Sequence, residues 1–338
     1  MRHFRWQLLI VLITGLVVGL ILVFQRSATP PALESTPNPV TGGSFTEALA
    51  GEIIRLNPAL DRFNQPDRDV DRLIFSSLIK FDSRGLPVGD LAADWEVSSE
   101  GTRYVVNLRE NAVWHDGTPL TSQDVLYTVS LLQSSSSLVP EDLRNFWQQI
   151  QAAALSDLSL EFSLPNSFAP FLDYLTFQVL PSHLLGNLSL DELVDHPFNL
   201  APIGTGPYRF KEFQVADGKI SGVSLEAFEY YYSGRPYIDE VHFKLYPDAK
   251  AALQAYLGDE ADAVAQIAHE DLVTALNQPG LDVHSSRLPR LTMVFLNTQN
   301  LTKPPLQSAE FRKALMAATN RQKLMDEVYA SQAVPALG

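Results

Sequence analysis

The sequence of 338 residues contains no cysteine. It can therefore form no disulfide, no thiolate metal site and no cysteine nucleophile, and it offers no N-terminal cysteine for lipid attachment. Basic residues are also scarce, because 25 Lys and Arg against 39 Asp and Glu give a formal net charge of −14. This balance disfavours nucleic-acid binding and suits a soluble domain held near, but not lying on, an anionic membrane.

Histidine is sparse as well, and its seven copies stand apart in the sequence. His-Glu-x-x-His and Gly-x-Ser-x-Gly are both absent, so local spacing assembles neither a metal site nor a catalytic triad. The adjacent His115 and Asp116 could form a dyad, but neighbours on an extended chain point to opposite faces, which favours a structural turn. We predict no cofactor and no metal. A hydrolase whose residues meet only in three dimensions stays an alternative.

One apolar run stands near the N-terminus. Residues 8–24 are apolar except for a threonine and two glycines, they follow Arg2 and Arg5, and as a helix they would cover roughly 25 Å. We predict that residues 1–26 form an uncleaved membrane anchor rather than a cleaved signal peptide, because the following sequence is a poor cleavage site. Arginines retained inside would leave the body outside the cytoplasm. Residues 27–43, rich in Pro, Ser and Thr, read as a linker.

A stretch of about thirty residues in the first half of the chain has the clearest local pattern. Residues 104–108 alternate apolar and polar side chains, which predicts a half-buried strand. Asp116 and Gly117 form a tight-turn dipeptide. Thr121 is placed as a helix N-cap, with Asp124 three residues later in the capping-box position. The pattern therefore predicts a strand, a turn and a capped helix.

Three further segments carry a periodic pattern. Residues 44–49 predict the first strand, residues 67–80 have apolar side chains at helical spacing, and residues 290–299 are strand-like. Ser77 to Lys80 also match the Ser-x-x-Lys string of penicillin-recognising enzymes. No Ser-Asp-Asn or Lys-Thr-Gly accompanies that string, so the match is weak evidence for an enzyme.

A glycine-rich loop lies in the second half of the chain. Gly204 and Gly206 flank Thr205 and precede Pro207 and Tyr208, which predicts an irregular backbone followed by a strand. No Gly-Lys-Ser/Thr is present, so a nucleotide site is disfavoured. We expect both glycines to need backbone angles that only glycine adopts.

Five segments in correct succession resemble family 5 solute-binding proteins, the peptide-binding subunits of bacterial ABC importers. They are GGSFTEALAGEIIRLNPAL, LRENAVWHDGTPLTSQDVLYTV, GTGPYRF, EYYYSGRPYIDEVHF and the unit from LTMVFLNTQN to FRKALMAATNRQKLMDEV. The resemblance implies an α/β, periplasmic-binding-protein-like fold of class II, cluster C, whose two lobes close by hinge motion on a solute. It runs from about residue 42 and covers only the first part of the family's length, so we expect an incomplete second lobe.

The resemblance also implies a domain plan and a ligand site. We expect the first lobe at residues 42–270, an insert subdomain at about 61–200, and the start of the second lobe at 271–338. In relatives the backbone after the first strand approaches the ligand, and the strand past the hinge lines the cleft. An ordinary strand end would explain the first of these segments equally well. The expected ligand-binding residues are Ala48, Leu49, Gly51, Thr292, Met293, Phe295 and Asn297.

The expected function is that of a membrane-tethered, extracytoplasmic solute-binding protein. It would act as a monomer, capture oligopeptides or dipeptides without bond chemistry, and deliver them to the permease and ATPase subunits of an ABC importer. A tethered sensor or accessory protein that binds peptides without feeding a transporter is an alternative. Relatives carry peptides, nickel complexes and sugars on one scaffold, so the fold does not settle the solute.

Overall fold

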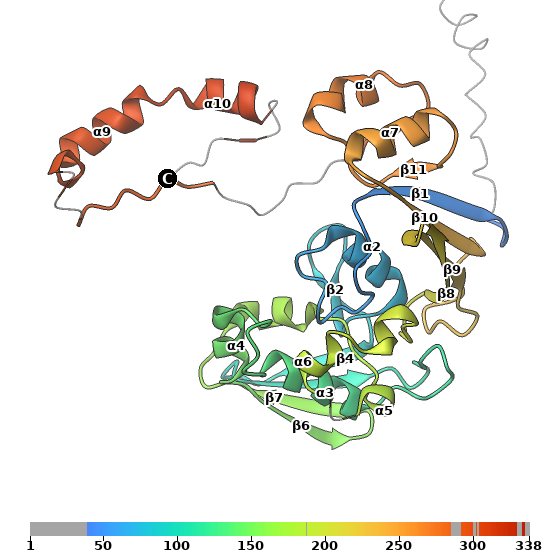
Figure 1. Ribbon diagram of the computed structural model, residues 1–338. Coiled ribbons are helices and arrows are strands. Elements are labelled where there is room, and N and C mark those ends of the chain that lie inside the picture. Colours follow the sequence, from blue (N-terminus) through green and yellow to red (C-terminus); the bar gives the residue numbers. More distant parts are fainter. Residues whose placement is uncertain are drawn as a thin grey trace, which may run out of the picture. The chain divides into compact units, whose positions relative to one another are not determined.

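The chain divides into two compact units, Met1–Val40 and Thr41–Gly338. The computed structural model describes residues 39–186, 188–284, 292–299, 302, 304–329 and 333–334 (Figure 1). The predicted anchor at residues 8–24 and most of the predicted linker therefore lie outside the described residues. Among the described helices, none is long and apolar enough to cross a membrane.

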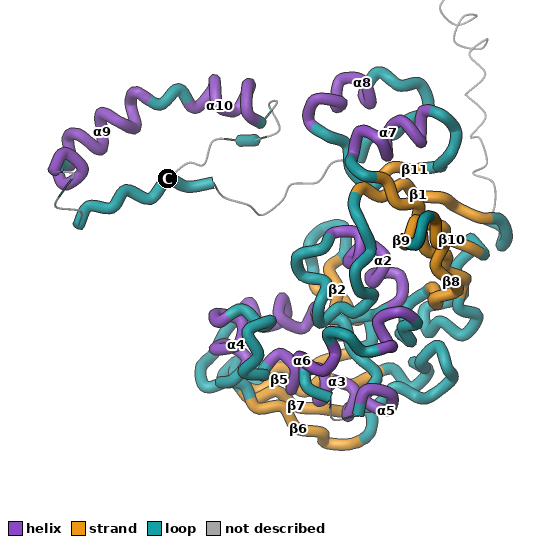
Figure 2. Tube along the Cα trace, viewed as in Figure 1, coloured by secondary structure: helices purple, strands orange, loops and turns teal. Residues whose placement is uncertain are grey.

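A five-stranded sheet joins the beginning of the described chain to residues more than 150 positions later (Figures 1 and 2). Its order is β11-β1-β10-β9-β8. Strand β1 lies between β10 and β11 and is parallel to both, whereas β8, β9 and β10 run antiparallel to their neighbours among these three. The strands are β1 (Ser44–Ala50), β8 (Tyr208–Ala216), β9 (Lys219–Ala227), β10 (Glu240–Tyr246) and β11 (Ala263–Val264). The first strand predicted from the sequence is confirmed.

A second sheet is built entirely from the chain between β1 and β8. It has the antiparallel order β4-β5-β7-β6, and a separate pair, β2 and β3, lies before it in the sequence. The bounds are β2 (Ile79–Phe81), β3 (Pro87–Gly89), β4 (Ala92–Val97), β5 (Arg103–Leu108), β6 (Gln151–Ser156) and β7 (Ser159–Ser163). The strand predicted over residues 104–108 is β5.

Short helices fill the connections. The α-helices are α2 (Gln65–Ile74), α3 (Ser122–Leu132), α4 (Glu141–Trp147), α5 (Ser182–Leu185), α6 (Leu190–Leu193), α7 (Ala249–Leu257), α8 (Leu272–Leu276), α9 (Ala309–Ala318) and α10 (Arg321–Val328). The 3₁₀ helices are η1 (Ala169–Thr176), η2 (Pro197–Leu200), η3 (His269–Asp271) and η4 (Pro304–Gln307). The predicted capping box at the start of α3 is present, and the Thr121 N–H donates to Asp124 across 2.9 Å.

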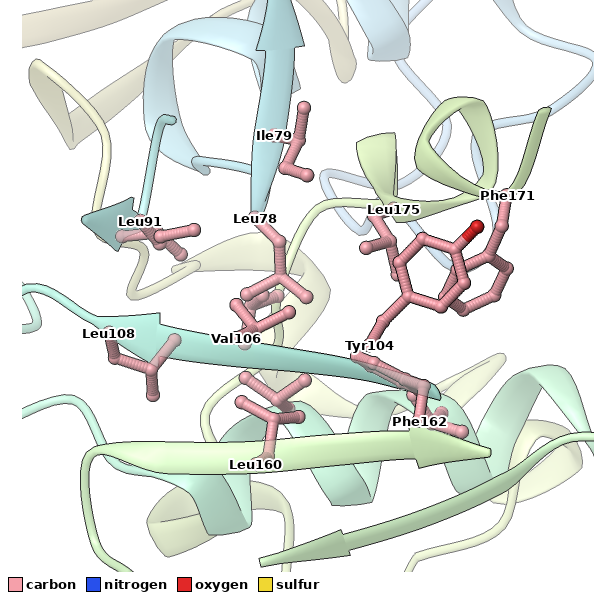
Figure 3. Close-up of a cluster of buried hydrophobic side chains, with 14 of the residues drawn as sticks. Leu78, Ile79, Leu91, Tyr104, Val106, Leu108, Leu160, Phe162, Phe171 and Leu175 are labelled. Carbon is pink, nitrogen blue, oxygen red and sulfur yellow. The ribbon is translucent and has the colours of Figure 1, made fainter. Parts of the chain in front are cut away.

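Each of the two larger sheets has its own apolar core. The second sheet packs Val106 and Leu160 against Leu78, Phe171 and their neighbours (Figure 3). The five-stranded sheet packs Leu49 and other strand residues against the apolar face of α2. Burying such side chains stabilises the fold by about 1.5–3 kcal/mol each relative to exposure.

Two predicted elements were wrong in extent or type. The helix predicted over residues 67–80 ends at Ile74, where Phe75 turns extended and the Gly206 N–H donates to the Ile74 carbonyl at 2.8 Å. Tertiary packing of the glycine-rich loop thus overrides the helical pattern. The strand predicted over residues 290–299 is absent from the described residues 292–299. These residues have no strand conformation and pair with no strand of the described sheets. A strand is stable only when a neighbour satisfies its backbone groups.

Candidate ligand-binding site

The carboxyl ends of the parallel strands β1, β10 and β11 meet at one edge of the five-stranded sheet. Open α/β sheets bind ligands outside this edge, because the loops that follow the strands converge there. The predicted residues Ala48 and Leu49 lie near the end of β1, and Gly51 follows the strand directly. The structure therefore brings this first predicted group together at the edge where a ligand is expected.

The side chains of Ala48 and Leu49 point into the fold rather than outward. Ala48 is fully buried and packs with Ala252 of α7 and with Ala261, while Leu49 is 1% exposed in the core beneath the sheet. The Ala48 carbonyl accepts the Ala265 N–H at 3.1 Å. Because these side chains are buried, any contact of Ala48 or Leu49 with a ligand would have to be made by backbone groups. That contact stays a prediction.

Gly51 follows β1 in a conformation that favours glycine. Its φ is +120°, and an added Cβ would lie 3.0 Å from Cγ of Pro66 at the start of α2. Its N–H donates to the Tyr246 carbonyl at 2.8 Å. The close approach of α2 explains this glycine without a ligand, and its predicted ligand contact is untested.

The loop after Gly51 is held by two polar residues that the sequence reasoning did not single out. The Asp67 carboxylate accepts the N–H groups of Ile54 at 2.8 Å and Arg55 at 3.1 Å. The Asn64 side-chain amide donates to the Glu52 carbonyl at 2.9 Å. Burial raises the pKa of Asp67, while the hydrogen bonds from the loop favour its charged form. An acid in the first turn of a helix is already explained by its favourable interaction with the helix dipole. The sequence alone therefore does not predict that Asp67 holds the loop.

The loop leaves one large apolar side chain in solvent. Ile54 is 56% exposed, whereas its neighbour Ile53 is 7% exposed. A loop with a fixed backbone and an exposed apolar side chain can meet a ligand at little cost in conformational entropy.

The second predicted group lies on the separate segment 292–299. Met293 and Phe295 are 56% and 84% exposed. The Thr292 hydroxyl oxygen accepts the Tyr329 hydroxyl at 3.1 Å, and the Asn297 side-chain oxygen accepts the Gln299 N–H at 3.0 Å. These residues stay a predicted cleft wall.

The glycine-rich loop is supported by a buried histidine. His115 Nδ1 accepts the Gly204 N–H at 3.2 Å, and Nε2 contacts the Gly206 carbonyl oxygen at 3.1 Å. Since Nδ1 is an acceptor, the proton of the neutral ring belongs on Nε2, and both ring nitrogens are satisfied. Burial lowers the pKa of His115 to about 4, which keeps the ring neutral at physiological pH.

The expected reason for the two loop glycines was wrong, although glycine is required at both. Neither Gly204 nor Gly206 has a positive φ. An added Cβ would instead lie 1.9 Å from the Ile74 carbonyl oxygen at Gly204, and 2.4 Å from the Leu73 carbonyl oxygen at Gly206. Close packing on the last turn of α2, and not backbone strain, excludes any larger residue.

The rest of the glycine-rich motif also has internal partners. Thr205 is fully buried and its carbonyl accepts the Ser76 hydroxyl at 3.3 Å. The Pro207 carbonyl accepts the Phe228 N–H at 2.9 Å, and the Tyr208 hydroxyl donates to a carbonyl at 3.2 Å as β8 begins. The motif therefore joins α2 to the five-stranded sheet.

Asp116 and Gly117 form the predicted turn. Gly117 has φ +88°, and the Asp116 carboxylate accepts the Thr118 N–H at 2.9 Å. The other carboxylate oxygen pairs with His183 Nε2 at 2.8 Å. Burial acts to raise the pKa of Asp116, but hydrogen bonds from His183 and Thr118 hold it below its usual value. His115 and Asp116 have different partners, so they do not form a dyad.

One cluster resembles the parts of a serine hydrolase. The Ser224 hydroxyl lies 2.7 Å from His242 Nδ1, and His242 Nε2 lies 3.4 Å from Glu240. Ser224 is 2% exposed, and the Gln214 side-chain amide donates to its hydroxyl oxygen at 2.7 Å. A nucleophile must reach its substrate, and this hydroxyl is enclosed between strands β9 and β10. The cluster is a cross-strand contact rather than a catalytic site.

Residues 87–338 match the family whose description is "Bacterial extracellular solute-binding proteins, family 5 Middle". The chain belongs to this family. It is 27% identical to the oligopeptide-binding protein AppA of Bacillus subtilis (strain 168) over 310 residues. This alignment covers 90% of this chain and 55% of that protein. It is 25% identical over 264 residues to the dipeptide-binding protein of Escherichia coli (strain K12), covering 73% of this chain and 48% of that one.

Solved structures agree with the family assignment. The structure of AppA from Bacillus subtilis in complex with a nonapeptide aligns with a TM-score of 0.68 and 26% identity, over 88% of this chain and 58% of that one. The predicted α/β, periplasmic-binding-protein-like fold is therefore confirmed. The chain spans about half the length of the curated relatives it matches.

Proposed function

We propose that this family 5 chain binds peptides outside the cytoplasm for an ABC importer. The observation that carries the proposal is the fixed loop of residues 51–55 at the carboxyl edge of the parallel strands. Two relatives named for oligopeptide and dipeptide binding support the solute class, as does the solved complex of AppA with a nonapeptide. The chain would hold its solute and release it unaltered to permease and ATPase subunits.

The proposed binding mode uses the loop as one wall of a cleft. Asp67 and Asn64 hold the loop backbone in place before a ligand arrives, so little entropy is lost on binding. Ile54 supplies an exposed apolar surface. The segment 292–297 would supply the opposite wall, with either Met293 and Phe295 or the alternate side chains facing the solute.

The proposed domain plan has a first lobe at residues 42–270 and the start of a second lobe at 271–338. An insert at about residues 61–200 would be a subdomain of the first lobe. Its support is that the four strands of the second sheet all lie between β1 and β8 in the sequence, with a separate apolar core. Closure of two lobes on a solute would follow from this plan.

The proposed location is the outer face of a membrane, as a monomer. Residues 8–24 would anchor the chain, and residues 27–43 would space its body from the bilayer. Mass spectrometry of the N-terminus from membranes distinguishes a retained anchor from a cleaved signal peptide. An N-terminus that begins after residue 26 would refute the anchor.

Equilibrium dialysis with labelled peptides of two to nine residues tests the solute class. We expect saturable binding that unrelated peptide sequences displace and that free amino acids do not. Real turnover of the peptides would favour the hydrolase alternative, and absence of any peptide binding would refute the proposal. Genes for a permease and an ATPase beside this one would favour an importer over a sensor.

A further inference from the structure

The chain at residues 57–64, between the loop of the candidate site and α2, is attached to the fold by a buried carboxyl group. Among residues 58–63, Asp61 alone is buried, whereas Phe63 is 90% exposed. The Asp61 carbonyl accepts the Asn64 N–H at 2.8 Å and closes the turn. An apolar side chain would hold this turn equally at any pH, but a carboxyl is easily buried only in its protonated form. We call residues 57–64 the acid loop.

A second carboxyl lies close to the acid loop, on α2. Asp71 is fully buried, and neither of its carboxylate oxygens has a hydrogen bond of good geometry among the described residues. The Asn57 amide, at the start of the acid loop, is the nearby group that favours its charge. The Phe75 N–H at 2.8 Å and the Gln178 side-chain amide at 3.0 Å both donate to the Asp71 carbonyl. These bonds hold α2 in place, so the acid loop is the part that can move.

A third carboxyl adds its charge to this region. Asp67 is 2% exposed and precedes Asp71 by four residues on α2, so the two share one face of the helix. Burial raises the pKa of Asp71 well above its usual value, and the charges of Asp61 and Asp67 raise it further. The charged groups that act on Asp71 in the described part of the chain are therefore both acids. Ionisation of one carboxyl here opposes ionisation of the others.

Asp61 has two cations nearby, but both also interact with other groups. Burial raises the pKa of Asp61 to about 7, although Arg68 and Arg72 act to lower it. Arg72 lies 3.6 Å from the Asp69 carboxylate, and Arg68 donates to the Arg62 carbonyl. The arginines therefore do not restore the ordinary acidity of Asp61, and near neutral pH its carboxyl changes between two charge states.

We propose that Asp61 and Asp71 form a proton-operated latch, which holds the acid loop closed when both are protonated and releases it when they ionise. In the closed loop, ionised carboxylates would lie near one another and away from water, and opening would let water solvate them. The acid loop continues directly from residues 51–55 of the candidate site. Control of peptide binding by the latch rests on the proposed function, whereas the latch itself does not.

The pH range of the latch follows from Asp61. Its ordinary pKa of 3.8 applies in the open loop, and burial raises its pKa to about 7 in the closed loop. Stabilisation of the closed loop is therefore complete below pH 3.8 and is lost as the pH rises to about 7, and Asp71 adds to the loss. Each pH unit within this range changes the ratio of open to closed loop by up to about tenfold.

Hydrogen exchange of the full chain in zwitterionic nanodiscs tests the latch without any peptide. The reporters are the Leu56 N–H, bonded to the Asn199 carbonyl at 3.2 Å, and the Asn64 N–H. The reference is the Gly101 N–H, bonded to the Ser98 carbonyl at 2.9 Å in the second sheet. Each rate is divided by the intrinsic rate at the same pH, which gives a protection factor.

We expect the protection factors of Leu56 and Asn64 to fall by about tenfold or more from pH 5 to 7. That of Gly101 should stay constant within about twofold, because no latch acts on its turn. Equal pH dependence at the acid loop and at Gly101 would overturn the proposal, and so would constant protection at all three amides.

Two variants identify the proton-binding groups. Asp71→Asn and Asp61→Asn each remove one of them at nearly constant volume, and the melting temperature checks that the variants are folded. Each should reduce the fall in protection at Leu56 by about threefold or more, and the double variant should abolish it. Asp94→Asn, at an exposed position of β4, is the matched control and should keep the wild-type fall. A fall that persists in the double variant would overturn the proposal.

Added peptide shows whether the latch acts on the proposed site. At about ten times its dissociation constant, a peptide that binds the closed loop should raise the protection of Leu56 at pH 7 by about tenfold. Bound peptide that leaves this protection unchanged would overturn the control of binding by the latch. Absence of peptide binding in dialysis would refute the proposed function, whereas the exchange at pH 5 and 7 would still decide for or against the latch.

Discussion

His115 Nε2 donates a hydrogen bond to the Gly206 carbonyl oxygen across 3.1 Å, between residues 91 positions apart in the sequence. The same ring accepts the Gly204 N–H through Nδ1. One neutral imidazole thus connects two segments that the sequence presents as separate motifs. It positions the glycine-rich loop against the end of α2, and Asp67 in the first turn of the same helix holds the fixed loop of the candidate site.

Replacing Gly206 with Ala should strongly destabilise the protein. The new Cβ would lie 2.4 Å from the Leu73 carbonyl oxygen, and a backbone atom cannot move aside as a flexible side chain can. We expect a loss of about 3 kcal/mol or more in the free energy of unfolding, measured by chemical denaturation. Gly204→Ala should behave in the same way.

Gly117→Ala is the matched control for that change. Gly117 has a positive φ but open space around its Cα, so only backbone strain opposes an alanine there. The expected cost is about 1–2 kcal/mol. If Gly206→Ala costs no more than Gly117→Ala, close packing on α2 is not the reason for the loop glycine.

His115 should make stability depend on pH. Burial lowers the pKa of His115 from its ordinary value of 6.5 to about 4 in the fold, so the unfolded chain takes up a proton first as the pH falls. The stabilisation is complete above pH 6.5, declines between pH 6.5 and about 4, and amounts to roughly 3 kcal/mol. The check is denaturation of wild type and His115→Gln from pH 8 to 4. The difference between them should shrink across this window, and a constant difference would contradict the neutral clamp.

Asp71 should destabilise the fold at neutral and alkaline pH. It is fully buried, neither carboxylate oxygen has a hydrogen bond of good geometry among the described residues, and the nearby Asn57 amide only partly favours the charge. Burial, then Asp61 and Asp67, raise its pKa well above the usual value. A raised pKa means that protonation stabilises the native state as the pH falls.

Asp71→Asn removes that charge at nearly constant volume. We expect a gain of at least about 1 kcal/mol at pH 8 that becomes smaller toward pH 5, measured by thermal denaturation. A loss of stability at pH 8 would show that the Asp71 carboxylate is satisfied in the native state.

Asp67→Ala should loosen the loop at the candidate site. Two backbone N–H groups, of Ile54 and Arg55, would lose their acceptor, at a cost of about 1–3 kcal/mol. Hydrogen exchange at these two amides should become faster. Asp94→Ala, at an exposed position of β4, is the control and should leave them unchanged. Unchanged exchange in Asp67→Ala would show that the loop is fixed by other contacts.

Local chemistry made parts of the fold predictable. The capping box of Thr121 and Asp124 and the turn at Asp116 and Gly117 depend on residues a few positions apart, and both are confirmed. The end of α2 was not predictable, because it is set by Gly206, more than 130 positions away. Local periodicity contains no information about such a partner.

The candidate site was predictable only in outline. The resemblance pointed to Gly51 as a ligand contact, which stays a prediction, but it did not indicate the close approach of Pro66, which depends on how the chain folds in space. The role of Asp67 could not be predicted from the sequence, because its partners are the backbone N–H groups of Ile54 and Arg55, and such groups have no sequence pattern. The burial of Ala48 and Leu49 depends on α7 and the core beneath the sheet, elements that only the folded chain brings together.

The most direct test of the peptide-binding proposal is photo-crosslinking of the full chain with a peptide that carries a benzophenone side chain. Crosslinks are mapped by mass spectrometry, and millimolar peptide allows even weak binding to be detected. The account predicts crosslinks to residues 51–55 and 292–297 that excess unlabelled peptide suppresses. Crosslinks confined to the second sheet, or crosslinks that unlabelled peptide does not suppress, would contradict it.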